Sequence, residues 1–329
     1  MMKVKKIVVF LIALLLLSSV GFSAFAAKSD WPQQLRFPSG PPGGTWFALG
    51  GAISDMWTKN VIHVGSGSGG GTSNIVNVAR GQADLGLSVT SALGAAVKGI
   101  DPFKEPIKGV SLFANLYRQY TYFIMRKDYA EAHGVKSVKD IVEKKLPIRF
   151  ATLKPGTSSE MAIRGIFERG YGVTWDDMKK WGASIQFASY SDGADLLADN
   201  HLDCFAFQVG RISPVIMDIE SRVDVILLPV DEEARRAMSE VYGTTTFNIE
   251  AGLYKGAQKP VPTVGDYTCI VVRDNLPADL VYELAKALWQ NKESLAEAFA
   301  DIKELNPKEA ITKGVPAHPG SVKFWSEVK

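Results

Sequence analysis

The chain has 329 residues, of which 46% are hydrophobic, 22% charged and 10% aromatic. This composition is typical of a globular protein with enough apolar surface for a core, and it excludes disordered and fibrous architectures. Two cysteines and four scattered histidines provide neither a disulfide framework nor the spacing of a metal site, so we expect no metal and no cofactor.

The N-terminus has the three parts of an export signal. Lys3, Lys5 and Lys6 form a basic start, residues 7–17 are an uninterrupted apolar run, and residues 24–26 are Ala-Phe-Ala, which suits a signal peptidase. We expect cleavage after Ala26 and a periplasmic mature protein. The alternative is a membrane anchor, for which the apolar run is short, and no cysteine near the cut offers a site for a lipid.

Removal of residues 1–26 changes the charge balance. It takes away three lysines and no acids, which leaves 34 basic against 35 acidic side chains and changes the formal charge from +2 to −1. A near-neutral protein lacks the basic surface that would attract nucleic acids or anionic membranes, so we expect neither as a partner. No later segment approaches eighteen consecutive apolar residues.

The first half of the chain alternates helix-like and strand-like segments. Apolar residues in 46–57 recur with helical spacing: Trp46, Leu49, Ile53, Met56 and Trp57. A second helix is expected around residues 75–78, ending near residues 80–81, and residues 84–87 read as a strand. The pattern is typical of an α/β fold with mainly parallel sheets.

The second half continues this alternation. A strand is expected at residues 148–151, a helix at 161–169, a helix around 196–197 before the strand 204–207, and a helix that begins after Pro277. Residues 120–126 and 264–272 are extended and apolar, so both are candidates for strands that cross between two lobes. Cys204 and Cys269 lie in apolar, strand-like runs, and we expect two free thiols although an oxidising compartment would permit a bridge.

A glycine-rich turn with hydroxyl residues precedes a helix three times. The turns are Gly43-Gly44-Thr45, Ser68 to Thr72, and Pro155 to Ser158. Free N–H groups at a helix start, aided by the helix dipole, bind anions, and glycine lets a ligand approach the backbone. Ordinary N-caps at Thr45, Thr72 and Thr157 are the alternative. Three such starts favour convergence on one pocket, because open α/β sheets bind ligands beyond the carboxyl ends of their strands.

The sequence lacks the motifs of three other kinds of site: a P-loop, a dinucleotide-binding site and a serine hydrolase site. No Gly-Lys-Ser/Thr follows these turns, so they are not P-loops. The glycines of residues 65–69 lack the acidic residue that a dinucleotide site needs after its second strand. Ser158 lacks the flanking glycines of a hydrolase nucleophile, and the lone His318 reads as structural or exposed.

At the same residues the chain resembles the TAXI type of solute receptor, which serves TRAP transporters (tripartite ATP-independent periplasmic transporters). Residues 43–52, Gly-Gly-Thr-Trp-Phe-Ala-Leu-Gly-Gly-Ala, look like the opening motif of that family. Family order continues with Gly69-Gly70 and Asn74, residues 81–85, 192–194, 203–205, 251–256, 261–264 and 315–320. Departures fall at residues 89–91, 153–158 and 209–214, where loops would face the ligand.

This resemblance implies the two-lobed fold of a periplasmic binding protein, type II-like, in which each lobe is a mixed or parallel sheet flanked by helices. The implied first lobe comprises residues 27–121 and 262–329, with the C-terminal helices, and the second comprises residues 122–261. The implied function is capture of a small organic acid between the lobes, a dicarboxylate or an amino acid such as glutamate or 2-oxoglutarate, and delivery to the membrane subunits of the transporter. The receptor would be a monomer. The alternative is an exported enzyme on the same fold, which would need a positioned general base.

Ten residues are candidates for the ligand site. Those of the first lobe are Thr45, Trp46, Ser68, Gly70 and Thr90, and those of the second are Thr157, Ser158, Gln208, Arg211 and Tyr254. Trp46 is also on the apolar stripe, so it lies either in the pocket wall or in the core. Arg211 either forks onto a carboxylate or forms a surface salt bridge. Arg118 and Tyr120, beside the first crossing strand, are second-rank candidates.

Overall fold

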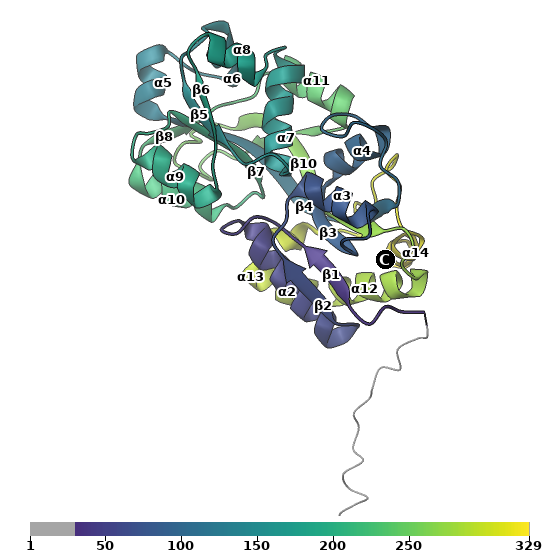
Figure 1. Cartoon of the computed structure of the whole chain (residues 1–329). Coiled ribbons are helices and arrows are strands. Elements are labelled where there is room, and N and C mark those ends of the chain that lie inside the picture. Colours follow the sequence, from purple (N-terminus) through teal and green to yellow (C-terminus); the bar gives the residue numbers. More distant parts are fainter. Residues whose placement is uncertain (1–29, 329) are drawn as a thin grey trace, which may run out of the picture. The chain divides into compact units, whose positions relative to one another are not determined.

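The computed structural model describes residues 30–328 (Figure 1). The expected signal peptide, residues 1–26, lies outside the described residues. The fold described below is that of one compact unit, which begins at Pro32. No helix among the described residues is long and apolar enough to cross a membrane.

Strands and helices alternate along the chain. The strands are β1 (Leu35–Pro38), β2 (Val64–Gly67), β3 (Leu85–Val89), β4 (Val110–Arg126), β5 (Arg149–Thr152), β6 (Ser184–Phe187), β7 (Cys204–Val209), β8 (Val225–Leu227), β9 (Thr245–Ile249) and β10 (Val261–Arg273). The helices are α2 (Thr45–Asn60), α3 (Gly71–Ala79), α4 (Thr90–Lys98), α5 (Lys127–His133), α6 (Val138–Glu143), α7 (Ser158–Gly165), α8 (Trp175–Lys180), α9 (Tyr190–Ala198), α10 (Pro214–Arg222), α11 (Glu232–Tyr242), α12 (Ala278–Gln290), α13 (Lys292–Ala298) and α14 (Pro319–Glu327). A π-helical turn, η2 (Ile166–Gly170), follows α7, and a 3-10 helix, η3 (Ala300–Glu304), follows α13.

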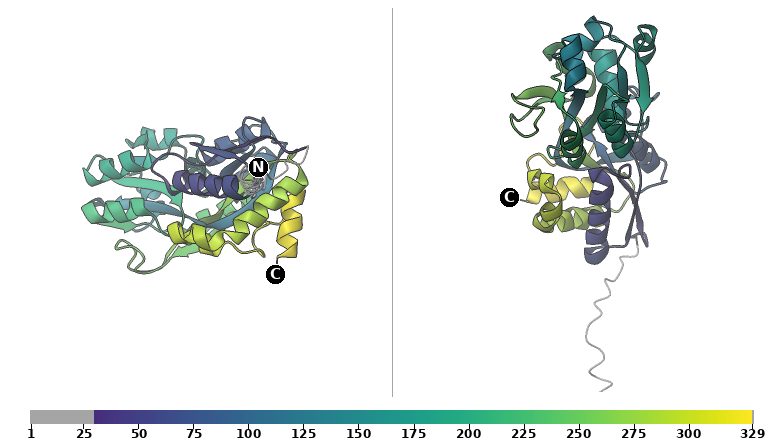
Figure 2. Two further views of the ribbon diagram at one scale, coloured as in Figure 1. Left: turned by 90° about the horizontal axis from the view of Figure 1, so that it is seen from below. Right: turned by 90° about the vertical axis from the view of Figure 1, so that its left-hand side faces the viewer.

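The helices expected from apolar spacing form where the sequence places them. In α2 the side chains of Leu49, Ile53 and Trp57 are fully buried, as one apolar stripe requires. The indole N–H of Trp57 donates to the Leu284 carbonyl of α12 at 2.9 Å. This contact fixes α2 beside α12, a pairing visible in both views of Figure 2, and so places the start of α2.

The main sheet is mixed rather than mainly parallel. Its strand order is β3-β10-β4-β7-β5-β6, with β8 beside β4 and β9 beside β10. Strand β7 pairs with β5, and β5 with β6, in parallel, whereas every pairing of β4 and β10 is antiparallel. A separate two-stranded parallel sheet joins β1 and β2. The expectation of mainly parallel sheets was wrong, because the two long strands β4 and β10 are antiparallel to the strands beside them.

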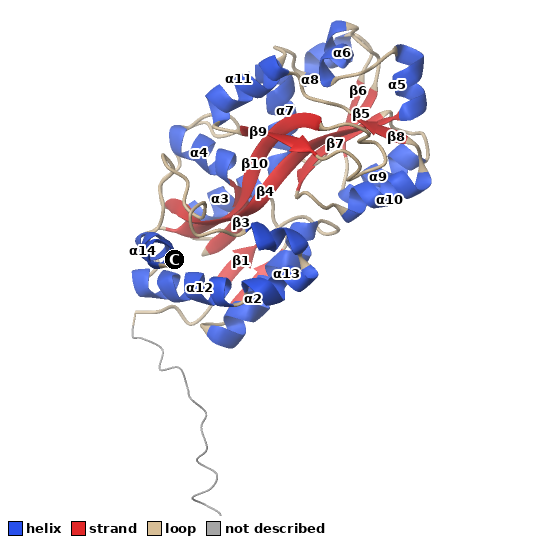
Figure 3. Ribbon diagram, turned by 180° about the vertical axis from the view of Figure 1, so that it is seen from behind, coloured by secondary structure: helices blue, strands red, loops and turns tan. Residues whose placement is uncertain are grey.

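Strands β4 and β10 link two halves of the fold. They run side by side through the molecule (Figure 3). Residues 268–272 of β10 pair with β3, and residues 261–265 pair with β9. Residues 120–126 of β4 pair with β7 and β8. The crossing strands expected from the sequence therefore exist, and they connect two lobes, although the lobe boundaries at residues 121 and 261 stay a prediction.

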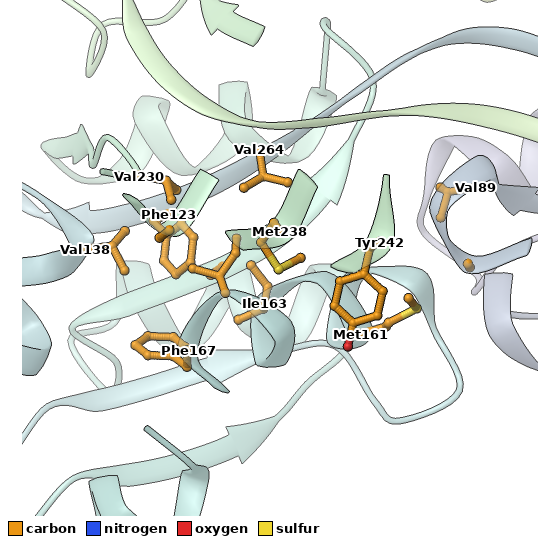
Figure 4. Packing of buried hydrophobic residues seen from close by; sticks show 14 of the residues in the cluster. Val89, Phe123, Val138, Met161, Ile163, Phe167, Val230, Met238, Tyr242 and Val264 are labelled. Carbon is orange, nitrogen blue, oxygen red and sulfur yellow. The ribbon is translucent and has the colours of Figure 1, made fainter. Parts of the chain in front are cut away.

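A large apolar cluster anchors α7 beneath the sheet. Phe123 of β4, Ile163 of α7, Phe167 of η2 and Met238 of α11 lie together (Figure 4) and are at most 1% exposed. Burial of four such side chains holds α7 firmly, so the start of this helix has a fixed position. The cysteines of β7 and β10 are buried free thiols, as expected.

Asp266 makes the fold pH-dependent. This carboxyl of β10 is buried, accepts hydrogen bonds from the backbone N–H and the hydroxyl of Ser91, and burial raises its pKa to about 6. Because the folded-state pKa is above the unfolded value, the folded state holds a proton between about pH 4 and 6 that the unfolded state lacks. The contribution of Asp266 to the free energy of unfolding is therefore fully present below about pH 4 and is lost, by about 3 kcal/mol or less, as pH rises through 6.

Asp266→Asn should remove this dependence. We expect the variant to melt at a higher temperature than the parent at pH 8, and this gain to shrink toward pH 4, where the parent carboxyl is protonated. Glu297→Gln, an exposed change of the same charge, is the control. Melting curves from pH 4 to 8 give the measurement, and a gain that stays constant with pH would contradict the assignment.

Candidate functional site

The three glycine-rich helix starts meet at one cavity. Its walls come from the N-termini of α2, α3 and α7 together with β4 and β7, and its volume is about 20 Å³. That volume holds about one water molecule. The three helix starts therefore converge on one cavity, as the sequence predicts, and the walls of this cavity lie close to one another.

Six of the ten candidate residues line this cavity. They are Thr45, Trp46, Gly70, Thr157, Ser158 and Gln208. They come from four elements that are far apart in the sequence, so the fold assembles the site.

The starts of α2 and α3 present free backbone donors. Gly44 and Gly70 are the N-caps, and neither helix has a side chain that caps it. The N–H groups of Thr45 and Trp46, and those of Gly71 and Thr72, find no acceptor within residues 30–328. Such donors at the positive end of a helix dipole favour a negative group.

The start of α7 is built differently. The Thr157 hydroxyl accepts from the Glu160 N–H at 3.1 Å and donates to the Lys154 carbonyl at 2.8 Å. Thr157 is therefore the ordinary N-cap that the sequence left as an alternative. Its hydroxyl is committed to the loop, although the residue borders the cavity.

Gln208 carries the strongest sign of a missing partner. Its side chain is 4% exposed and lines the cavity, yet neither its amide oxygen nor its amide nitrogen has a hydrogen-bond partner among the described residues. The backbone of Gln208 is fixed by the Ser159 hydroxyl, which accepts from its N–H at 3.0 Å and donates to its carbonyl at 3.1 Å. A buried amide without hydrogen-bond partners lowers the stability of the fold by about 1–3 kcal/mol. The amide of Gln208 is therefore available to a ligand, as are the free backbone donors.

Aromatic side chains form another part of the wall. The Trp46 indole N–H donates to the Thr268 hydroxyl at 3.2 Å, and the Gln119 amide donates to the same hydroxyl. Burial raises the pKa of Tyr190 to about 12 and raises that of Tyr117 further, so both phenols stay neutral. Trp46 is half-buried and lies in the cavity wall, although it also starts the apolar stripe of α2.

The two sides of the cavity touch at glycines. The Ser73 N–H of α3 donates to the Gly156 carbonyl before α7 at 3.2 Å. A Cβ at Gly70 would lie 2.5 Å from that carbonyl oxygen, and a Cβ at Gly44 would lie 2.7 Å from the Tyr190 ring. Only glycine permits this approach, so these positions set how closely the walls meet.

Ser68 and Thr90 do not line this cavity. Ser68 is exposed, because the loop turns its side chain outward before Gly70. Thr90 is buried at the start of α4, and its hydroxyl donates to the Asn115 amide oxygen at 2.7 Å. Thr90 thus joins α4 to β4.

Arg211 and Tyr254 also lie elsewhere. The Tyr254 hydroxyl accepts from the Ser213 N–H at 2.8 Å and donates to the Arg211 carbonyl at 2.9 Å, so it holds the loop after β7. The Arg211 guanidinium pairs with Glu250 at 3.2 Å, which is the surface salt bridge that the sequence left open.

Arg211→Ala should therefore leave ligand affinity unchanged within about twofold. An exposed ion pair contributes about 0–1 kcal/mol, so we also expect little change in melting temperature. Calorimetric titration of parent and variant provides the measurement. A tenfold loss of affinity would show that the guanidinium swings from Glu250 to the ligand.

Several wall residues were not among the candidates predicted from the sequence, and three of them have large polar side chains. Tyr117 and Gln119 of β4 line the cavity, as does Tyr190 at the start of α9. Side chains alternate across a strand, so the second-rank candidates Arg118 and Tyr120 take the opposite face. Arg118 lies over the Phe247 ring at 5.5 Å. The alternation of side chains along β4 could have identified Tyr117 and Gln119 as wall residues. To use it, however, one must already know which face of the strand one of its residues occupies.

No charged side chain lines the cavity among the residues that the structure describes. His318 is buried far along the chain as the N-cap of α14, where its ring accepts from the Gly320 N–H at 3.2 Å. Within residues 30–328 no group of three histidine, cysteine or acidic side chains is placed to hold a metal ion. The chemistry available at the site is hydrogen bonding by backbone amides, by the side-chain amides of Gln119 and Gln208 and by hydroxyl groups, next to aromatic rings.

Comparisons with known proteins identify the fold. The model of the NMT1-like family matches residues 37–328. No curated protein matches the sequence significantly. Among solved structures, the periplasmic binding protein BugD is similar with a TM-score of 0.52 and 15% identity over 90% of this chain and 93% of that one.

Two proteins of Rhodopseudomonas palustris are similar as well. MatC, with bound malate, has a TM-score of 0.50 and 14% identity over 85% of this chain and 90% of that one. Rpa4515, with adipate, has a TM-score of 0.50 and 16% identity over 89% and 93%. At these identities the likeness shows the fold, which is that of two-lobed periplasmic solute-binding proteins.

Proposed function

The chain belongs to the NMT1-like family, and we propose that it is an extracytoplasmic solute receptor of a TRAP transporter, of the TAXI type. In this proposal it binds a small organic acid between its lobes, either a dicarboxylate such as 2-oxoglutarate or an amino acid such as glutamate. It then delivers the acid to membrane subunits. The two-lobed fold and the motif order from residue 43 to residue 320 support this assignment.

One observation carries the proposal. The unpaired amide of Gln208 lies in the same cavity as the free N–H groups at the starts of α2 and α3. A carboxylate there would accept from these donors, and each charge-assisted bond is stronger than a neutral one. A micromolar affinity needs about 8 kcal/mol, so a few such bonds suffice without a cationic side chain.

The small volume of the cavity indicates how the receptor works. A space of about 20 Å³ is too small for an organic acid, so the walls must separate before a ligand enters. The strands β4 and β10 connect the halves and are the places where such a hinge would bend. Reclosure then replaces the water around the ligand with fixed donors.

Mass spectrometry of small molecules released from the protein as purified tests this function. We expect an organic acid, and we expect that acid to raise the melting temperature of the emptied protein, because a ligand that binds only the folded state stabilises it. Release of no acid, together with no shift from any of a panel of dicarboxylates, monocarboxylates and amino acids, would refute the proposal.

A further inference from the structure

A second cavity adjoins the first. Its volume is about 370 Å³, and it shares the wall residues Gly44, Thr45 and Tyr117 with the small cavity. We call the small cavity, at the three helix starts, the inner cavity and this larger one the outer cavity. The outer walls come from the starts of α2 and α10 and from the chain around the junction of α13 and η3. The two spaces meet at the start of α2, so a ligand anchored inside would extend outward along this route.

The outer cavity differs from the inner one in chemistry. Its walls are mainly apolar, with Ile212, Pro214, Val215 and Phe299 among them, and its single charged lining residue within the described chain is Asp301. The guanidinium of Arg211 is near enough to act on the Asp301 carboxyl, but Arg211 does not line the outer cavity and is paired with Glu250. Asp301 lies against the loop after β7, since a Cβ at Gly210 would overlap its carboxylate.

Burial, and to a lesser degree the neighbouring Glu304, raise the pKa of Asp301 to about 6. The carboxyl is therefore mostly ionised at pH 7.5. A negative group in the outer cavity would meet this charge as well as apolar walls.

We propose that the two cavities form one amphipathic ligand site, in which the inner cavity takes a single carboxylate and the outer cavity takes an uncharged, apolar remainder of the same molecule. The preferred ligand is then a monocarboxylic acid with an apolar chain or ring, not a dicarboxylate. This inference rests on the proposed receptor function, keeps the small organic acid of that proposal, and replaces its dicarboxylates and amino acids with a monocarboxylic acid.

Two physical effects disfavour a second carboxylate. Transfer of a charged group from water to an apolar wall without a counter-charge is strongly unfavourable. Repulsion from Asp301 adds to this penalty. An apolar chain gains instead from leaving water, by about fourfold in affinity for each buried methylene, the ratio that corresponds to about 0.8 kcal/mol.

Hexanoate and adipate provide the test, because they have the same six carbons and differ by one carboxylate. Calorimetric titration of the full mature protein at pH 7.5 should show hexanoate binding at least tenfold more tightly than adipate. Equal or tighter binding of adipate would overturn the inference and leave the receptor function intact. Binding of neither acid, nor of any acid in the wider panel, would overturn the receptor function and the inference with it.

Asp301→Asn separates the charge effect from shape. The variant should reduce the preference for hexanoate over adipate at least threefold, because it removes the repulsion and keeps the size of the side chain. Glu297→Gln on α13 is an exposed change of the same charge and should leave the preference unchanged. A preference that Asp301→Asn does not alter would overturn the role given to this carboxylate.

Ala48→Phe tests the outer cavity directly. Ala48 lines the outer cavity and not the inner one, so a larger side chain there fills only the space for the ligand's remainder. We expect hexanoate affinity to fall at least tenfold and propanoate affinity to stay within twofold. An equal loss for both acids, or no loss for hexanoate, would overturn the inference.

Discussion

Alanine at Gly70 is expected to lower ligand affinity at least tenfold while the empty protein still folds. The added Cβ would lie 2.5 Å from the Gly156 carbonyl oxygen, which is backbone and cannot rotate away. The loops before α3 and α7 must then stay apart, and the closed form becomes a minor state. Because apparent affinity falls in proportion to the fraction of protein that can close, a closed fraction of one tenth gives a tenfold loss.

Gly51→Ala is the matched control for this prediction. Gly51 lies inside α2, and a Cβ there meets no atom within 4 Å, so the substitution leaves the cavity untouched. We expect unchanged affinity and a gain of about 0.5–1 kcal/mol in the free energy of unfolding, since alanine favours a helix over glycine. Small-angle scattering adds a second readout: the ligand-bound Gly70→Ala protein should keep the larger radius of gyration of the empty parent. Parent-like affinity with parent-like compaction would show that the loops do not meet as closure requires.

Local signals in the sequence were enough to find the helix starts. Gly44 and Gly70 stand directly before helices whose apolar residues recur with helical period, and this pattern depends on neighbours within a few positions. The cavity at these starts could be expected because the carboxyl ends of strands in an open sheet lie together. Both predictions needed only short-range information and a general rule of α/β folds.

The aromatic and amide walls required tertiary information. Tyr117 and Gln119 lie within a 17-residue strand that is almost entirely buried, so its two faces could not be told apart by hydrophobicity. Tyr190 reaches the cavity because α9 begins opposite Gly44, a pairing between residues that are far apart in the chain. The Arg211 salt bridge depends on Glu250, and no sequence pattern near Arg211 predicts that partner.

Gln208→Leu is expected to weaken ligand binding about thirtyfold or more and, at the same time, to raise the melting temperature of the empty protein. The buried amide of Gln208 has no partner in the described chain, so the empty protein loses no hydrogen bond when the amide is replaced. Leucine has a similar volume and removes the desolvation penalty of the amide, whose size is about 1–3 kcal/mol. With ligand present, the same replacement removes a donor and an acceptor from the bound acid, and about 2 kcal/mol of lost binding corresponds to roughly thirtyfold.

The opposite signs of these two effects separate a ligand residue from a structural one. A structural glutamine would give a lower melting temperature and, through partial unfolding, a modest loss of affinity. Gln186→Leu on β6 makes the same chemical change at an exposed position and should leave ligand affinity unchanged. Melting curves of the empty proteins combined with calorimetric titration measure both quantities. If Gln208→Leu lowers the melting temperature and retains affinity, the amide serves the fold, and the acid must be held by the backbone donors of α2 and α3 alone.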